Sequence, residues 1–242
     1  MTAVPRAYHL TFDIDWAPDW AVLDVLDILN EHDAPATFFV THASPTIAVI
    51  AERGHEVGIH PNFLLGSSHG DEPLAVMRSV FEYAPSARVM RTHSLVQGTT
   101  LFEAILAEHP EIEYDLSLLT YGSRHTGWTP WRSRGKAMRR FNYNWEDDLA
   151  FDDPDMDWRK YRPAATIDVL DFHPIHVVLN SSREDAYMSL KRHLGPGHLH
   201  EATRDETLSR TEPGPGTADF LHAVLSSPSK ALSFEELRCV SD

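Results

Sequence analysis

Near its N-terminus the chain reads Tyr8-His9-Leu10-Thr11-Phe12-Asp13-Ile14-Asp15-Trp16, and this stretch decides the fold. Apolar and polar residues alternate through it, which predicts a strand. Because residues two apart in a strand point the same way, we expect Asp13 and Asp15 on one face and Phe12 and Ile14 on the other. Adjacent carboxylates repel each other, and a bound cation or a shared proton relieves that repulsion. The alternative interpretation is a pair of loop or helix-capping aspartates.

Working outward from this strand, helices and strands alternate, which predicts parallel strands in an α/β sheet or barrel. The expected helices cover residues 19–32, 46–53, 73–83 and 101–108, and the expected strands 36–40, 56–60, 87–91 and 112–115. Residues 121–161 are expected to form long loops, with only 138–145 resembling a strand. Strands over 166–173 and 175–179, a helix over 183–193, an irregular stretch over 195–216 and a helix over 220–226 complete the prediction. No linker interrupts the chain, so we expect a single domain over 1–242.

Composition narrows the class of protein. A net charge of −15 over 242 residues argues against a nucleic-acid partner and against docking on an anionic membrane. No apolar run reaches the roughly 20 residues that a membrane-spanning helix needs. Residues 1–9 lack the apolar core of a secretory signal, so a cytoplasmic location is expected. The single cysteine, Cys239, excludes an internal disulfide and is expected to be buried. Nothing in the sequence indicates the oligomeric state.

Chemically active side chains recur where the predicted strands end. His60 ends one strand, Arg91 and His93 share a face at the end of another, and residues 171–176, Asp-Phe-His-Pro-Ile-His, supply a further polar end. One such histidine alone is more often a satisfied core residue. Several together predict a catalytic or metal site at the edge where the strand ends meet.

These segments resemble the polysaccharide deacetylases (carbohydrate esterase family 4) over about residues 9–179. The resemblance implies a distorted (β/α)7-type barrel. Residues 11–15, Thr-Phe-Asp-Ile-Asp, are similar to a variant of the first family motif, T-F-D-D-G, which implies that Asp13 is the general base and Asp15 a metal ligand. Residues 54–60, Gly-His-Glu-Val-Gly-Ile-His, match the second motif and imply that His60 is a ligand.

The remaining motifs imply the other roles. Arg91 would orient Asp13, and His173, in Phe-His-Pro, would be the general acid. The fourth motif resembles residues 145–148, and the residues expected to contact substrate are Trp16, Trp145, Glu146 and Asp147. Trp128, Trp131 and Trp158 are expected to pack the long loops, with sugar stacking as the alternative. His176 is expected to face away from the site in an extended strand, either as a structural residue or as one that supports the site residues.

One position departs from the family pattern. The second motif places another metal histidine four residues after the first, but here that position is Leu64, which cannot ligate. His93 is the predicted replacement, because it lies two residues after Arg91 on the inward face. Asn62 is the rival, His69, in a flexible Gly/Ser loop, is a weaker choice, and a water is the remaining alternative.

The implied cofactor is a divalent metal, with zinc favoured by the mixture of nitrogen and oxygen donors. The implied function is a hydrolase that removes N-acetyl groups from a sugar or glycan precursor, and the implied partner is this small-molecule or glycan substrate. The alternatives are a hydrolase of a non-sugar, cyclic amide and a catalytically silent glycan-binding relative. The extension over 195–242 has no chemical assignment, and its neighbourhood supplies three expected loop histidines: His193, His198 and His200.

Overall fold

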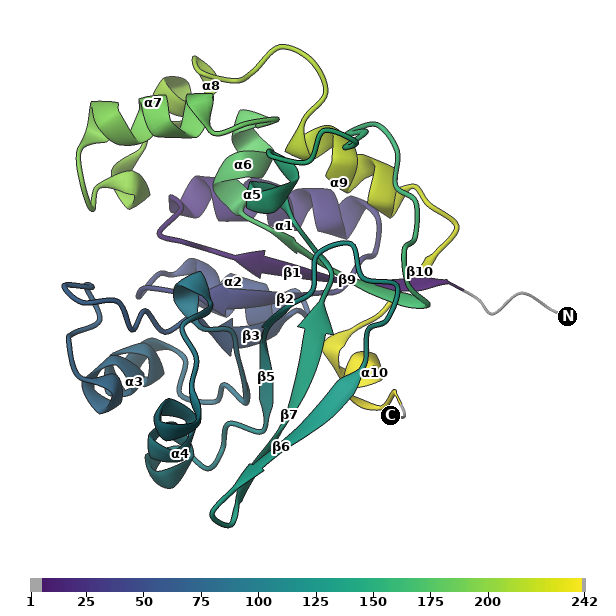
Figure 1. Ribbon diagram of the computed structural model, residues 1–242. Helices are drawn as coiled ribbons and strands as arrows, with labels where there is room; N and C mark the ends of the chain where they lie inside the picture. The colour runs from purple at the N-terminus through teal and green to yellow at the C-terminus, as the bar shows by residue number, and fades with distance from the viewer. Residues whose placement is uncertain (1–5, 241–242) are drawn as a thin grey trace, which may run out of the picture.

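The computed structural model describes residues 6–240, in which one curled sheet carries helices on its outer side (Figure 1). Residues 1–5, part of the segment interpreted above as lacking a secretory signal, and residues 241–242 lie outside the described range. The strands are β1 (Ala7–Asp13), β2 (Ala36–Val40), β3 (Glu56–Ile59), β4 (Val89–Met90), β5 (Tyr114–Leu119), β6 (Trp128–Ser133), β7 (Lys136–Tyr143), β8 (Trp145–Glu146), β9 (Ile167–Phe172) and β10 (Lys230–Ala231). The α-helices are α1 (Asp19–Glu31), α2 (Thr46–Glu52), α3 (Pro73–Tyr83), α4 (Thr99–Glu108), α5 (Asp147–Ala150), α6 (Pro174–Leu179), α7 (Asp185–Leu194), α8 (Arg204–Leu208), α9 (Thr217–Leu225) and α10 (Phe234–Arg238), and the 3-10 turns are η1 (His93–Leu95) and η2 (Leu199–Glu201).

The sheet confirms the predicted α/β fold class, as a half-barrel. Its strands run in the order β6-β7-β5-β4-β3-β2-β1-β9-β8, and β10 pairs with the first residues of β1. The described pairings are parallel except for the β6–β7 hairpin, which is antiparallel. Parallel strands bring their carboxyl ends to the same edge, so the sheet edge beyond β1, β3, β4 and β9 gathers the residues that follow them.

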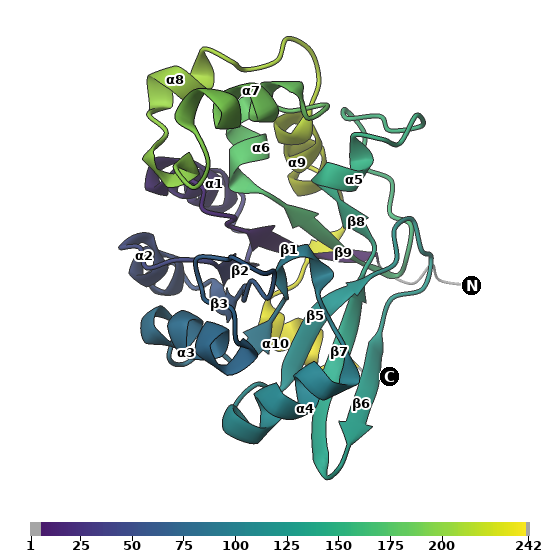
Figure 2. The same ribbon diagram turned by 60° about the vertical axis from the view of Figure 1, so that its left-hand side comes forward.

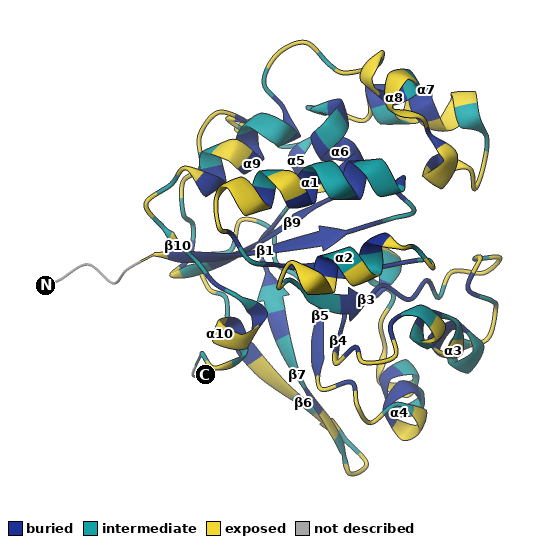
Figure 3. Ribbon diagram, turned by 180° about the vertical axis from the view of Figure 1, so that it is seen from behind, coloured by how far each residue is buried: buried dark blue, intermediate teal, exposed yellow. Residues whose placement is uncertain are grey.

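Alternation along β1 divides the interior into two cores. Tyr8, Leu10 and Phe12 pack toward the outer helices, in a cluster with α1, α3, α4, α6 and α9. Figure 3 shows β1 buried while the outer helices expose their far sides. A second cluster joins residues of β2, β5, β6 and β7 to Phe234 and Leu237 of α10. Figures 1 and 2 show α10 far from α7 and α8, which lie together at the other end of the molecule.

The structure corrects several expectations. Residues 174–179 form helix α6, so the strand predicted over 175–179 is wrong. The loop prediction for 121–161 missed strand β6 and the hairpin that it forms with β7. The stretch 195–216 contains η2 and α8, and His193 lies in helix α7 and not in a loop. Cys239 is exposed, contrary to the expected burial. Within residues 6–240, no helix has the length and apolarity needed to cross a membrane.

Candidate active site

The predicted site residues converge on one edge of the sheet. Asp13 is the last residue of β1, His60 follows β3, Arg91 follows β4 and His173 follows β9. A cavity of about 90 Å³ lies at this edge, and its walls include Asp13, Asp15, His60, His93, Glu146 and His173. Side chains separated by up to 160 residues in sequence therefore share one small, largely buried space.

Asp15 reaches the site by a different route from the one predicted. Strand β1 ends at Asp13, so the alternation of a strand does not extend to Asp15. Instead Asp15 and Trp16 both adopt left-handed backbone conformations, with φ of 45° and 57°. Non-glycine residues in this region cost about 1–3 kcal/mol each, and such conformations cluster at functional sites. The strained turn places the Asp15 carboxylate beside that of Asp13.

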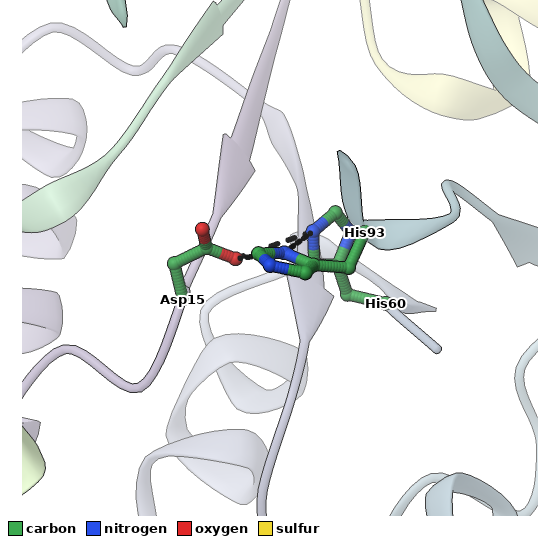
Figure 4. A group of neighbouring side chains, drawn as sticks. All are labelled: Asp15, His60 and His93. Carbon is green, nitrogen blue, oxygen red and sulfur yellow. Dashed lines mark hydrogen bonds and ion pairs between the residues drawn. The ribbon is translucent and has the colours of Figure 1, made fainter. Parts of the chain in front are cut away.

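Asp15, His60 and His93 form a compact set of metal-ligating atoms (Figure 4). Asp15 Oδ1 lies 3.2 Å from His60 Nε2 and 3.2 Å from His93 Nδ1, and the two ring nitrogens are 3.2 Å apart. Zinc bonds of about 2.0–2.1 Å to nitrogen and oxygen imply about 3.3 Å between neighbouring ligands of a tetrahedron. The three atoms therefore fit one face of such a site. A second left-handed pair, Ser94 and Leu95, follows His93 and mirrors the strained turn at Asp15.

Electrostatics favour a cation between these side chains. Burial alone would raise the pKa of Asp15, but hydrogen bonds with His60 and His93 hold it well below its ordinary value, so the carboxylate is ionised. Burial lowers the pKa of His60, which favours the neutral imidazole that a metal requires. The other ring nitrogen of His60, Nδ1, is buried without a hydrogen-bond partner among residues 6–240. The usual supporting bond to a ligating histidine is thus absent on that side.

The rivals of His93 are engaged elsewhere. The side-chain oxygen of Asn62 accepts the backbone N–H of Leu64 at 3.0 Å, closing a local turn. His69 is buried: Nδ1 accepts the backbone N–H of Asn62, and Nε2 lies 2.5 Å from the carbonyl oxygen of Thr41. Of the three candidates, His93 is the one brought to Asp15 and His60. It arrives on turn η1 and not on a strand, because β4 ends at Met90.

Arg91 sits beneath Asp13 and is fully buried between the rings of Phe39 and Tyr143. Its Nη1 donates to Asp13 Oδ1 at 3.0 Å and also to Asp171. Asp171 lies on β9, two positions before His173. Burial raises the pKa of Asp13 to about 6, against the opposing effect of Arg91. Asp13 is therefore mostly ionised at neutral pH while remaining a competent proton acceptor.

His173 faces Asp13 across the cavity. Ligating atoms of Asp13, Asp171 and His173 all lie within 4.8 Å of one another. His173 Nδ1 lies 2.7 Å from Asp147 Oδ1, and its backbone N–H donates to Asp147 Oδ2 at 2.8 Å. Burial opposes the charged imidazole, but Asp147 and Asp148 hold the pKa of His173 well above its ordinary value. His173 therefore carries a proton on the side that faces the cavity.

The fourth-motif residues separate into different environments. Glu146 lines the cavity and accepts a hydrogen bond from the Tyr143 hydroxyl at 2.8 Å. Asp147 is completely buried and its oxygens are taken by His173, so it orients that ring. Trp145 packs against Phe172 and Phe220 and borders a separate cavity of about 380 Å³ that contains none of the converging residues. Neither Asp147 nor Trp145 lines the cavity of about 90 Å³, and the substrate contacts expected of them stay predictions.

The surroundings of the other aromatic residues differ from one another. Trp16 borders a further cavity beside the site and touches the ring of His93. Trp128, Trp131 and Trp158 pack as structural residues, as predicted. The expectation that His176 faces away from the site in an extended strand is wrong. His176 lies in helix α6, its Nε2 is 2.8 Å from Asp148 Oδ1, and its ring centre is 5.6 Å from that of His173.

Sequence reasoning gave no role to three residues beside the site: Asp171, Asp148 and Tyr143. The signal for Asp171 was present, because it lies two positions before His173 and so shares its face of the strand. Asp171 also pairs in register with Thr11, which lies two positions before Asp13 on β1. No comparable sequence signal marked Tyr143, whose ring packs against the guanidinium of Arg91 because the curled sheet brings β7 close to that residue.

A family model and one solved structure agree with this fold. The model of a family described as WbmS-like polysaccharide deacetylase matches residues 10–191. The crystal structure of a putative polysaccharide deacetylase involved in O-antigen biosynthesis from Bordetella bronchiseptica is 32% identical, with a TM-score of 0.74 over 90% of this chain and 89% of that one. The catalytic domain of a peptidoglycan N-acetylglucosamine deacetylase from Eubacterium rectale is 18% identical over 72% of this chain and 79% of that one, with a TM-score of 0.42. No curated protein matches this chain.

Proposed function

This chain belongs to the WbmS-like polysaccharide deacetylases, and from that premise we propose that it is a metal-dependent hydrolase that removes an N-acetyl group from a sugar or glycan precursor. The observation that carries the proposal is the convergence of a three-atom metal face, a buried Asp–Arg pair and a charged histidine on one cavity of about 90 Å³. The description of the Bordetella relative supports a glycan precursor as substrate. A cytoplasmic location is part of the same proposal.

Asp15, His60 and His93 would hold the ion, which we propose to be zinc because imidazole nitrogen and carboxylate oxygen suit it. When bound, a divalent cation would polarise the acetamide carbonyl and lower the pKa of water toward about 7.

The protein's own side chains supply the proton transfers. Asp13 accepts a proton from the attacking water, and the guanidinium of Arg91 keeps Asp13 charged and fixed in direction. His173 donates a proton to the leaving amine nitrogen from the opposite wall. Asp147 supports this step, because it stabilises the charged imidazole and fixes the ring through two hydrogen bonds.

This arrangement favours a hydrolase over a silent glycan-binding protein. Binding alone would not require a base, a buried guanidinium and a charged acid around one space. A non-sugar amide as substrate finds no particular support in the cavity, and it becomes an outcome of the experiment below.

The test compares Asp13→Asn with Asp15→Asn in zinc content and in acetate released from N-acetyl sugars. Asp13→Asn should retain the metal and lose about 10²–10⁴-fold in kcat, the usual contribution of a general base. Asp15→Asn should lose both metal and activity. Asp33→Asn is the matched control, because Asp33 is exposed and its left-handed backbone suits asparagine.

Unchanged turnover in Asp13→Asn would show that the base is assigned wrongly. A wild-type protein that binds metal and releases no acetate points to the non-sugar amide, and one without metal points to the silent binding protein.

A further inference from the structure

A second cavity adjoins the candidate active site and is built largely by the C-terminal part of the chain. Its volume is about 160 Å³. One side is formed by Asp15, Trp16 and His93, and the other by Tyr187, Lys191 and Leu199. Asp15 and His93 also line the smaller cavity that holds Asp13 and His173, so the two spaces meet at the metal-ligating side chains. A substrate whose acetamide occupies the smaller space would extend into the larger one.

The two cavities differ in charge. The walls of the smaller cavity carry the carboxylates of Asp13, Asp15, Glu146 and Asp148 and no lysine or arginine. The larger one contains Lys191, whose ammonium nitrogen lies 4.9 Å from the centre of the Tyr187 ring. Lys191 is thus the lysine or arginine that the described chain contributes to the combined space.

Apart from the contact of the exposed Lys191 ammonium with the Tyr187 ring, neither donor has a partner among the described residues. Among residues 6–240, no carboxylate lies within ion-pair distance of Lys191, and the half-buried Tyr187 hydroxyl makes no hydrogen bond. The two side chains are four residues apart on α7, so they project from the same face of the helix. A cation and a hydroxyl donor are therefore held side by side, facing a cavity, without an acceptor.

Support of the helix terminus does not explain Lys191. Basic residues in a last helical turn are favourable, but α7 already has Arg192 and His193 there. What sets Lys191 apart from Arg192 is that it borders the cavity. This difference between neighbours provides a matched control.

We propose that Lys191 and Tyr187 bind an oxyanion carried by the substrate, so that the preferred substrate is an acidic N-acetyl sugar. The inference rests on the proposed function and assigns the substrate class of that site. The oxyanion is a carboxylate on the sugar ring or a phosphate attached to it, since both present oxygen acceptors to an ammonium and a hydroxyl. The acetamide then lies at Asp13 and His173, and the oxyanion lies in the adjoining cavity beside Lys191 and Tyr187.

Binding to the zinc-loaded Asp13→Asn protein, measured by calorimetry, tests the inference without depending on turnover. The probes are N-acetylglucosamine, its 1-phosphate and its 6-carboxylate, together with the corresponding galacto sugars. At least one acidic sugar should bind about 10- to 100-fold more tightly than its neutral parent, as charge-assisted hydrogen bonds allow. A preference for the carboxylate or for the phosphate identifies the source of the anion.

The variants connect this preference to the residues. Lys191→Ala should bring the ratio of acidic to neutral affinity close to one, Lys191→Glu should invert it, and Tyr187→Phe should reduce it in part. Arg192→Ala should leave the ratio unchanged. Equal binding of acidic and neutral sugars, no binding of any acidic sugar, or a ratio that survives Lys191→Ala would each overturn the inference. Failure of the wild-type protein to release acetate from any sugar would instead count against the proposed function, whatever the binding ratio.

Discussion

Two buried carboxylates, Asp13 and Asp171, share the single guanidinium of Arg91. Thr11 Oγ1 also donates to Asp171 at 2.6 Å, whereas Asp171 Oδ2 is buried without a partner. Burial raises the pKa of Asp171 to about 8, against the pull of Arg91, so this carboxyl retains a proton at neutral pH. One cation then balances one anion, and Asp13 is left as the charged member of the pair.

This protonation predicts how stability varies with pH in metal-free protein. A carboxyl whose pKa is higher in the folded state binds more protons when folded, so its contribution to stability is lost as pH rises from about 4 toward 8. Asp171→Asn removes this dependence, by up to about 1.4 kcal/mol per pH unit. The melting temperature of the variant minus that of the wild type should therefore increase between pH 5 and pH 8. A constant difference over that range would show that Asp171 is ionised in the folded protein.

At this scale the sequence predicted the participants better than their geometry. Asp13, Asp15, His60, Arg91 and His173 meet as expected, because the ends of parallel strands share an edge. Strand alternation did not predict the positions of Asp15 and His93 correctly, because each residue lies in a turn beyond the end of its strand. Their roles as ligand, base and acid remain predictions.

Turn chemistry explains the secondary-structure elements that were missed. Helix α6 begins with Pro174 in its first turn and ends at Asn180, whose φ of 48° is left-handed. Proline at the start and asparagine at the end are helix signals. The apolar, β-branched run between them suggested a strand because a short apolar run is ambiguous. The β6–β7 hairpin was hidden by its turn, where Arg134 occupies a position at which asparagine is the familiar signal.

That turn yields a prediction for the hairpin. Arg134 and Gly135 have φ of 46° and 78°, the signs of a type I′ turn. Arginine is strained in this conformation, and its side chain is 83% exposed with only a 3.5 Å ion pair to Glu103. Arg134→Asn should raise the free energy of unfolding by about 1 kcal/mol, because asparagine tolerates left-handed backbone. Urea unfolding measures the change, and Arg132→Asn, in an extended strand, should bring no gain. Equal effects of the two substitutions would contradict the explanation.

At the scale of the whole molecule, the C-terminal part of the chain contacts both ends of the half-barrel. Residues 187–199 border the cavity beside the candidate active site. Residues 230–238 lie at the start of β1, where β10 extends the sheet and α10 inserts Phe234 and Leu237 into the second hydrophobic cluster. The ring of His9 ties this segment down, with Nδ1 2.8 Å from the carbonyl oxygen of Leu232. The sequence did not predict the role of residues 230–238, because the strands that they contact are distant in sequence.

The packing of α10 against the second hydrophobic cluster predicts that Phe234→Ala destabilises the protein without changing its catalytic chemistry. The Phe234 side chain is 4% exposed and contacts the rings of Tyr114 and His9, so its truncation leaves a cavity among residues of several strands. The free energy of unfolding should fall by about 3–5 kcal/mol. Leu208→Ala, at a residue 45% exposed, should change it by less than about 0.5 kcal/mol.

Because Phe234 lies at the end of the strands opposite to Asp15, metal content at low temperature should be retained in both variants. A loss below about 1 kcal/mol in Phe234→Ala would mean that the strands hold their curl without α10, and loss of metal from folded Phe234→Ala protein would mean that the two ends are coupled.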